Sequence, residues 1–302
     1  MPSLNMVLAQ AMLGLNVGIF YAMLSLGLAV IFGLLGVINF AHGAFYMLGA
    51  FLALIGYSYL SVWLGIDGFG FGFWAALIIV PIVVAIIGMI IERLLLRRLY
   101  GQDPIYGLLL TFGVALIMQG LFTNYFSVAG TPYPGKPESL GGAINLGFMY
   151  FPTYRLFSIV LSIVVCLATW FVIERTRLGS TLRAGVENPQ LTQAFGINVP
   201  RMITLTFGFG VGLAGLAGVL AAPIYSVSPL MGADLIVVVF AVVVIGGMGS
   251  IMGAIVTGLA LGLIQGLTKV VYPPAANTVI FFIMVAVLLI RPAGLFGKHE
   301  KG

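Results

Sequence analysis

Charged side chains are scarce in this sequence, which excludes an ordinary water-soluble protein. Only 7% of the 302 residues are Asp, Glu, Lys or Arg, and 61% are hydrophobic, whereas soluble domains carry about 25% charged residues. Charge-free runs such as 104–135 and 202–233 exceed the roughly 20 apolar residues that cross a bilayer as a helix. Transmembrane β-barrels show shorter, alternating segments instead. The sequence therefore predicts an all-α integral membrane protein.

Catalytic and metal-binding motifs are also missing. The single cysteine, Cys166, excludes an intrachain disulfide or a cysteine-based metal site. His42 and His299 are far apart and belong to no H-E-x-x-H motif, and no G-x-x-x-x-G-K-[ST] loop is present. We expect no catalytic residues, no metal, no cofactor and no ATPase activity, so any coupling to ATP requires a partner. The net charge of +5 sits in clusters at span ends and does not indicate nucleic-acid binding.

The apolar runs predict a single transmembrane domain over residues 1–302, a polytopic helix bundle of about 8–10 spans. The run 235–247 is too short to cross a core about 30 Å thick, which predicts broken or re-entrant segments. No Lys or Arg precedes the first apolar run, so we expect it to be retained rather than cleaved as a signal peptide. The nine predicted spans lie near 10–36, 40–60, 72–92, 105–126, 155–174, 202–222, 235–247, 251–268 and 277–290.

Basic residues predict the orientation, because short cytoplasmic loops are rich in Lys and Arg. Three basic clusters fall on the same side of the nine predicted spans, which places the loop 127–154 outside and the loop 174–201 inside. It also predicts a cytoplasmic C-terminus in a multi-pass protein of the bacterial inner membrane. The clusters consist of Arg93, Arg97 and Arg98; Arg175, Arg177, Arg183 and Arg201; and Arg291, Lys298 and Lys301.

The inner loop 174–201 contains the signals of a short helix. Asn188 is suited to cap a helix that has Pro189 at its first position, and Gly196 is suited to end it. Such a helix, lying parallel to the membrane, would present a compact knob to a soluble partner.

Polar interruptions between apolar runs are candidate transport elements, because transporters place broken helices around their substrate path. The stretch Gly36–Ala44 resembles Gly246–Ala254 as a weak internal repeat. His42 is either a pathway residue or a histidine hydrogen-bonded between helices. Asp234 either faces the outer mouth or caps a helix that begins at Leu235. Glycines four residues apart, such as Gly258 and Gly262, predict close helix packing, within the chain or in a dimer.

Four ordered motifs resemble the LivH-type permeases of ATP-binding-cassette importers for branched-chain amino acids. They are G-V-I-N-F-A-H-G at 36–43, the segment 178–200, G-G-M-G-S-I-M-G-A at 246–254 and R-P-A-G-L-F-G at 291–297. The resemblance extends from about residue 14 to residue 297. One departure lies in the inner segment, where Glu187-Asn188 stands in place of the full E-A-A signature of many importer permeases.

The resemblance implies a transport subunit that works in a complex. The implied partners are a second, related permease subunit, two ATPase subunits and a periplasmic binding protein, with the lipid bilayer around the assembly. The loop 127–154 and Asp234 would face the binding protein. The implied ATPase-coupling residues are Arg183, Ala184, Glu187, Asn188, Ala194 and Gly196. The implied pathway residues are Asn39, His42, Gly246, Gly247 and Gly249.

Three alternatives remain open at this stage. Related permeases with the same motifs serve urea or short amides, and the pathway residues do not distinguish these substrates from aliphatic amino acids. A stand-alone channel or ion-coupled carrier is disfavoured because charged residues inside the spans, the usual relay, are nearly absent. A membrane enzyme is disfavoured because no nucleophile, metal set or acid pair converges.

Overall fold

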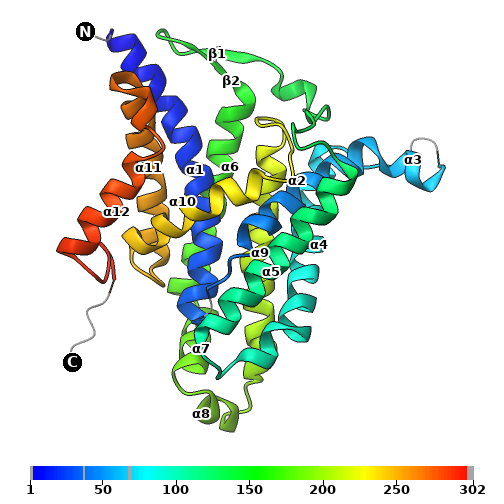
Figure 1. The fold of residues 1–302 in the computed structure, drawn as a ribbon, viewed down its shortest axis with the longest axis vertical. Helices are drawn as coiled ribbons and strands as arrows, with labels where there is room; N and C mark the ends of the chain where they lie inside the picture. Colours follow the sequence, from blue (N-terminus) through cyan, green and yellow to red (C-terminus); the bar gives the residue numbers. More distant parts are fainter. Residues whose placement is uncertain (1–2, 37, 67–69, 298–302) are drawn as a thin grey trace. The chain divides into compact units, whose positions relative to one another are not determined.

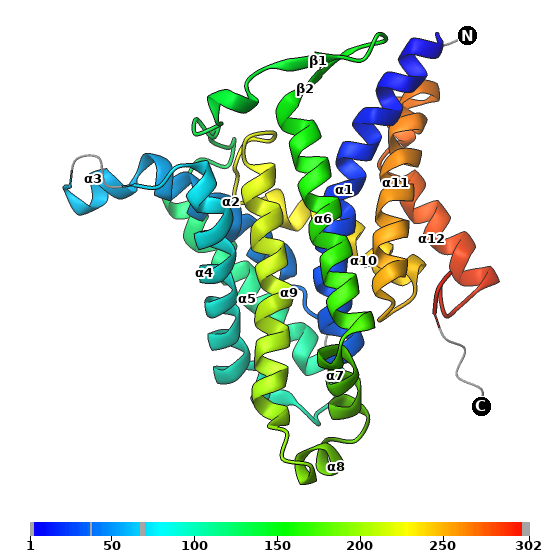
Figure 2. The same cartoon turned by 180° about the vertical axis from the view of Figure 1, so that it is seen from behind.

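The structure is a computed structural model that describes residues 3–36, 38–66 and 70–297. Within these ranges the chain folds into α-helices, short 3₁₀ turns and one β-hairpin. The elements are α1 Leu4–Leu35, α2 His42–Ser58, α3 Leu60–Leu64, α4 Phe73–Leu94, η1 Leu96–Leu99, α5 Pro104–Tyr125, η2 Glu138–Leu140, β1 Ala143–Asn145, β2 Tyr150–Pro152, α6 Thr153–Arg175, α7 Arg177–Glu187, α8 Pro189–Ala194, α9 Val199–Ala221, α10 Met231–Gly246, α11 Ile251–Val271, η3 Pro273–Ala275 and α12 Val279–Ile290 (Figures 1 and 2).

Nine apolar helices among the described residues coincide with the nine predicted spans. Six of them, α1, α4, α5, α6, α9 and α11, are long and apolar enough to cross a membrane, and α2, α10 and α12 are shorter. The chain is therefore a multi-pass membrane protein with an all-α fold, as predicted. The segment predicted over 235–247 begins earlier, at Met231, but with 16 residues it is still shorter than a full crossing.

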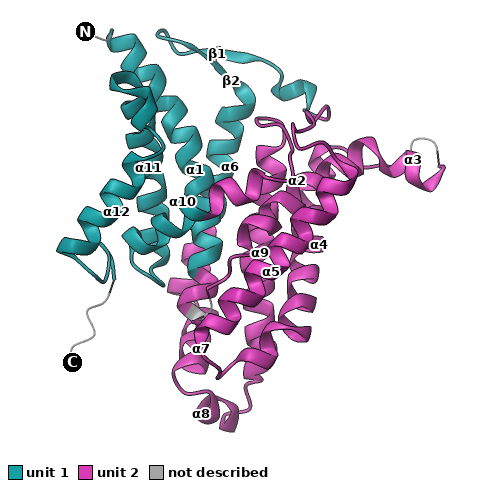
Figure 3. Cartoon of the chain, in the orientation of Figure 1, with its two compact units in different colours: residues 1–29, 136–167, 237–302 teal, residues 30–135, 168–236 magenta. Residues whose placement is uncertain are grey.

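The chain divides into two compact units, coloured separately in Figure 3. Unit 1 comprises residues 1–29, 136–167 and 237–302, and unit 2 comprises residues 30–135 and 168–236.

Unit 1 is built on close contact between α1 and α11, which lie side by side in Figures 1 and 2. A Cβ atom added to Gly262 would overlap the backbone of Gly18, and Gly258 and Gly266 also face α1. Glycines permit this approach because they have no side chain. Close backbone packing is needed here because lipid provides no hydrophobic drive for helices to associate. These predicted glycine pairs therefore serve packing within the chain.

A chain of polar side chains accompanies this contact, with Tyr21 and Gln265 buried and Asn277 exposed. The Tyr21 hydroxyl donates to Gln265 Oε1 at 3.0 Å, and Gln265 Nε2 donates to Asn277 Oδ1 at 2.8 Å. Polar side chains inside a membrane bundle need such partners because hydrocarbon offers none.

The predicted outer loop 127–154 contains structure that its turn-rich sequence did not reveal. Strands β1 and β2 pair antiparallel, with Ile144 opposite Phe151. The turn between them places Gly147 at φ +84°, and its N–H donates to Asn145 Oδ1 at 2.9 Å. Gly147 suits this position because a side chain is disfavoured at positive φ.

Unit 2 packs α2, α4 and α9 together. A Cβ atom on Gly49 of α2 would overlap the backbone of Gly215 of α9, and a Cβ atom on Gly218 would overlap the Tyr46 backbone; a Cβ atom on Gly215 would instead crowd Val84 of α4. Helix α5 differs, because Thr111 is its one buried residue. Most of its apolar surface, including Phe112 and Leu116, is exposed.

Candidate coupling segment and translocation pathway

The short helix predicted in the inner loop is present as α8. Asn188 caps it by accepting a hydrogen bond from the Leu191 N–H at 2.9 Å, and Pro189 occupies the first helical position. Gly196 has φ +82° and its N–H donates to the Gln193 carbonyl at 2.9 Å, which ends the helix. The predicted capping by Asn188 and Gly196 is confirmed.

Helix α7, which was not predicted, precedes α8 and ties it to the end of α6. Arg183 donates to the Ile173 carbonyl at 3.1 Å and lies 3.5 Å from Glu174 Oε2. A Cβ atom on Gly179 would overlap the Ile173 carbonyl, so α7 approaches the α6 backbone directly. The Thr192 hydroxyl of α8 donates to the Ala184 carbonyl of α7 at 3.0 Å. Arg183 thus fixes α7 to α6, and Ala184 fixes α8 to α7. We call the stretch Arg177–Gly196, which contains α7 and α8, the coupling segment.

The coupling segment presents a mixed surface. All six residues assigned to it by resemblance are exposed, including Glu187 and Ala194, and neither ion pair within the described residues involves Glu187. Sequence reasoning missed two large apolar side chains, Leu191 and Phe195, which are 56% and 78% exposed. The two residues are four positions apart and so lie on one helical face; this spacing could have predicted an exposed apolar patch.

A buried polar network anchors the start of α9, where the coupling segment rejoins the bundle. Glu92 is fully buried at the end of α4. Its carboxylate accepts hydrogen bonds from the Thr204 hydroxyl at 2.6 Å and the Tyr100 hydroxyl at 3.1 Å. Arg97 lies 3.7 Å from Glu92 and donates to the Thr204 hydroxyl and the Pro200 carbonyl at 2.9 and 2.8 Å. Burial, followed by the Glu92 charge, raises the pKa of Tyr100, so this hydroxyl remains a donor.

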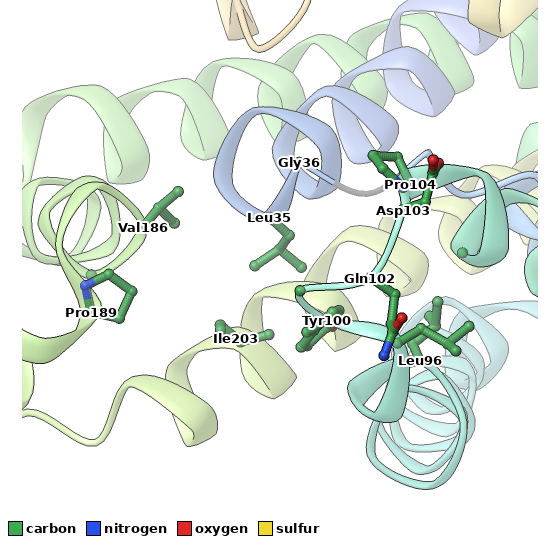
Figure 4. Close-up of a pocket in the computed structure, with 14 residues that line it drawn as sticks. Leu35, Gly36, Leu96, Tyr100, Gln102, Asp103, Pro104, Val186, Pro189 and Ile203 are labelled. Carbon is green, nitrogen blue, oxygen red and sulfur yellow. The ribbon is translucent and has the colours of Figure 1, made fainter.

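A cavity of about 270 Å³ lies beside the coupling segment. Figure 4 shows Val186 and Pro189 on one side, with Leu35, Tyr100 and Ile203 facing them. Its lining also includes Gly36, where α1 ends, and Asp103 and Pro104, where α5 begins. The cavity therefore lies between the coupling segment and both of these helix ends.

The first pathway candidates lie in the break between α1 and α2. Asn39 Oδ1 accepts a hydrogen bond from the Ala41 N–H at 3.1 Å, and the Asn39 carbonyl accepts from the His42 N–H at 3.2 Å. Asn39 is 1% exposed and His42 is fully buried. The Asn39 Nδ2 atom is buried without a hydrogen-bond partner among the described residues. Unpaired buried amides cost free energy, so Asn39 offers a donor at this break.

Thr111 of α5 holds the same break. Its Oγ1 accepts a hydrogen bond from the Phe40 N–H at 3.1 Å, and its hydroxyl faces the Leu108 and Ile38 carbonyls at 3.0 and 3.4 Å. A hydroxyl from one helix therefore satisfies backbone groups that the interrupted helix leaves free, as non-helical backbone in a membrane requires. Sequence reasoning did not identify Thr111.

A second, smaller cavity of about 100 Å³ adjoins the start of α2. It lies between α2, α5 and the beginning of α10, and its walls are apolar apart from Gln119. Its lining includes Phe40, two residues before α2, Met47 of α2, Phe112 of α5 and Ile236 of α10. This environment suits an aliphatic group.

The other pathway candidates lie in the break between α10 and α11. Gly246 and Gly247 are buried and Gly249 is partly exposed. A Cβ atom on Gly247, which has φ +99°, would overlap the backbone of Gly297. The Ile245 and Gly246 carbonyls accept hydrogen bonds from the Leu295 and Phe296 N–H groups at 2.8 and 3.1 Å. Two of the sequence motifs therefore meet here, and the pathway role of these glycines stays a prediction.

The prediction that Asp234 caps a helix beginning at Leu235 is wrong. Helix α10 begins at Met231, so Asp234 lies within its first turn. There its negative charge favours the positive end of the helix dipole. Asp234 is exposed, so it is still available to a partner.

Comparisons with known proteins match almost the whole chain. Residues 10–289 match the family described as branched-chain amino acid transport system, permease component. The high-affinity branched-chain amino acid transport system permease protein BraD of Pseudomonas aeruginosa is 32% identical over 99% of both chains. The LivH permease protein of Escherichia coli is 31% identical over 97% of this chain and 96% of its own.

The LivM permease protein of Escherichia coli is 29% identical over 88% of this chain and 65% of its own. No solved structure matches. A family match over this length, with whole-chain relatives above 30% identity, establishes what the motifs suggested. The chain belongs to the family of permease components of branched-chain amino acid transport systems.

Proposed function

We propose that this chain is the membrane-spanning permease subunit of an ATP-binding-cassette importer that carries branched-chain amino acids across a bacterial inner membrane. BraD and LivH, its whole-chain relatives, are named as permease proteins of such amino acid systems. The observation that carries the proposal is the exposed coupling segment, which extends from a bundle of membrane-spanning helices. ATP hydrolysis is assigned to partner subunits.

The coupling segment has the shape and chemistry to dock in an ATPase groove. Leu191 and Phe195 provide apolar anchors that would become buried on docking, and buried aromatic anchors dominate the energetics of many interfaces. Glu187 lies in the same exposed segment and supplies a charge at the rim. The hydrogen bonds of Asn188 and Thr192 keep α8 rigid, so a push on α8 is passed to the bundle instead of being absorbed by bending.

Two features of unit 2 support substrate passage at the break between α1 and α2. The chain is non-helical between α1 and α2, and among the described residues Asn39 contributes an unpaired amide donor there. The neighbouring cavity has apolar walls and one polar side chain, Gln119. A branched-chain amino acid combines an aliphatic side chain with a carboxylate that accepts hydrogen bonds. We assign Asn39 and His42 to the translocation pathway, together with Gly246, Gly247 and Gly249 of the α10–α11 break.

The remaining assignments concern the sides of the membrane and the partners. The coupling segment and the end of the chain face the cytoplasm, and the loop 127–154 and Asp234 face a periplasmic binding protein. Two ATPases and a second permease related to this chain complete the assembly. The similarity of LivM to this chain supports pairing with a related permease. The whole chain acts as one permease domain.

Reconstitution tests the transport proposal. The chain would be placed in liposomes alone, and then together with the ATPase, permease and binding protein encoded beside it. We expect uptake of labelled leucine only from the complete set with ATP, and competition by isoleucine and valine but not by urea. ATP-independent uptake by the chain alone would contradict the proposal.

Co-purification tests the coupling segment. The substitution Phe195→Asp should abolish capture of the ATPase while leaving the amount of folded permease unchanged, because Phe195 is largely exposed. Glu187→Lys should weaken capture. The matched control is Tyr150→Asp, which changes a 73% exposed aromatic residue in the hairpin. Capture of the ATPase by Phe195→Asp at the control level would refute this docking surface.

A further inference from the structure

A basic pocket lies where α4 ends and α9 begins. It has a volume of about 480 Å³ and is lined by Arg93, Arg97 and Arg201 together with polar and apolar residues of α9. Arg93 lies in the last turn of a membrane-spanning helix and Arg201 in the first turn of another. Three guanidinium groups therefore gather at one end of the spans, at the level where a bilayer presents its headgroups.

Two of these arginines have no acidic partner among the residues that the structure describes. Arg97 is held by Glu92, Thr204 and the Pro200 carbonyl. Arg93 and Arg201 are exposed, and neither takes part in an ion pair within the described part of the chain. Free guanidinium groups are suited to phosphate, because their planar N–H donors match its oxygens. The pocket therefore offers positive charge that the acidic side chains of the described residues do not neutralise.

An apolar groove continues from the pocket. The groove has a volume of about 540 Å³ and shares Asn198, Arg201 and Leu205 with it. Its further walls come from the end of α6, one face of α7 and the first turns of α9, including Leu182 and Phe209. From Arg201 to Phe209 the groove follows about 12 Å of helix at 1.5 Å per residue. It therefore runs from the headgroup level into the apolar part of the span.

Exposed apolar side chains flank the groove. Leu178 on α7 is 66% exposed, and Leu205 and Phe209 on α9 are 63% and 44% exposed. Helix α7 contributes Leu178 and Leu182 to the groove, together with Thr181 and, at its first residue, Arg177, while Arg183 lies outside the lining and is exposed. This is the pattern of a helix lying in the membrane interface.

We propose that this pocket and groove bind one anionic phospholipid of the leaflet that they face. The phosphate contacts Arg93 and Arg201, and an acyl chain lies along Leu182, Leu205 and Phe209. Basic pockets between membrane helices are known sites for anionic headgroups, and the adjoining groove selects a lipid over a free phosphate. Because α6, α7 and α9 all border the groove, the lipid links the coupling segment to the bundle.

The test measures lipid binding to the purified full-length chain in neutral detergent by native mass spectrometry. The probes are long-chain phosphatidylglycerol, phosphatidylethanolamine with the same chains, glycerol 3-phosphate and inorganic phosphate. Each arginine near anionic lipid contributes about 1 kcal/mol, or about fivefold in affinity. We expect phosphatidylglycerol to bind roughly 25-fold more weakly to the double variant Arg93→Gln, Arg201→Gln.

The matched control is the double variant Arg98→Gln, Arg291→Gln, which removes the same charge at exposed positions outside the pocket and groove. We expect it to bind phosphatidylglycerol within twofold of the unaltered chain. If the Arg93, Arg201 double variant cannot be purified, the single variants Arg93→Gln and Arg201→Gln should each lose about fivefold.

Three outcomes would overturn the proposal. The first is an equal loss of affinity for phosphatidylglycerol in the control variant and in the Arg93, Arg201 variant, which would indicate a general charge effect. The second is equal affinity for phosphatidylethanolamine, which would remove the role of the headgroup charge. The third is binding of glycerol 3-phosphate or inorganic phosphate as tight as that of the lipid. The pocket would then bind a soluble anion, and the groove would contribute nothing to binding.

Discussion

The Glu92 network makes a quantitative prediction about what holds the start of α9. The substitutions are Thr204→Val, which removes the hydroxyl and keeps the shape, and Glu92→Gln, which removes the charge. Both single variants and the double variant form a double-mutant cycle, which isolates the energy of the Glu92–Thr204 contact. Thr204→Ser is the control, because it keeps the hydroxyl.

The expected magnitude follows from the geometry. The Thr204 hydroxyl donates to a fully buried carboxylate at 2.6 Å, and hydrogen bonds to charged groups contribute about 1.5–3 kcal/mol. Thr204→Val should therefore lower the free energy of unfolding by about 2 kcal/mol, and Glu92→Gln by more, because the Tyr100 and Arg97 contacts weaken as well. Arg97 contributes least, because its side chain is 34% exposed and its charge is screened by solvent.

Unfolding of the purified chain in mixed micelles of neutral detergent and dodecyl sulfate, followed by circular dichroism, measures these changes. We expect a coupling energy of about 1–2 kcal/mol between Glu92 and Thr204 and a stability near the starting value for Thr204→Ser. A coupling energy below about 0.5 kcal/mol, within the additivity of independent sites, would show that the network does not hold α9.

Three further predictions test other contacts. Asn188→Ala should destabilise α8 by about 1 kcal/mol and speed amide hydrogen exchange there, whereas Asn188→Asp should not, because Asp also caps helices. Equal exchange rates in the two variants would contradict the capping role. Gly218→Leu, whose Cβ atom would overlap the Tyr46 backbone of α2, should prevent α2 and α9 from packing and give an aggregated or protease-sensitive protein, while Gly120→Leu on α5, where a Cβ atom meets nothing within 4 Å, should be tolerated. Thr111→Val should reduce leucine uptake without lowering expression, because the Phe40 N–H loses its acceptor. Thr111→Ser, which keeps the hydroxyl, should retain uptake. Unchanged uptake by Thr111→Val would show that Thr111 is not needed at the break between α1 and α2.

The sequence predicts the membrane helices well because the signal is local. A charge at a helix centre costs about 2.5–3.5 kcal/mol, so membrane helices show as uncharged runs; nine apolar helices of the described residues lie where spans were predicted, and six of them are long enough to cross a membrane. The cap at Asn188 was also predictable, because Asn followed by Pro acts on its immediate neighbours. Helix α7 was missed, since its sequence is polar and its stability depends on contacts such as that of Arg183 with α6.

The candidate site was predicted less completely because its contacts join distant parts of the chain. Glu92 looked like one of several acids at span ends, and nothing in its neighbourhood indicates that Thr204, 112 residues away, completes its hydrogen bonds. Thr111 is likewise an ordinary helical residue until the fold brings it to Phe40. The burial of Gly247 depends on a segment 50 residues later in the chain. Such pairings require the three-dimensional structure.

The contact between the α10–α11 break and residues 294–297 has a consequence for biosynthesis. The Ile245 and Gly246 carbonyls accept hydrogen bonds from the Leu295 and Phe296 N–H groups, which leave the ribosome about 50 residues later. Until then these carbonyls and the surface over Gly247 must be covered by water, lipid or an insertion factor. The break is therefore completed after α11 and α12 have been inserted, which makes this corner of unit 1 the last to assemble and the first to be lost in a chain cut short before Gly294.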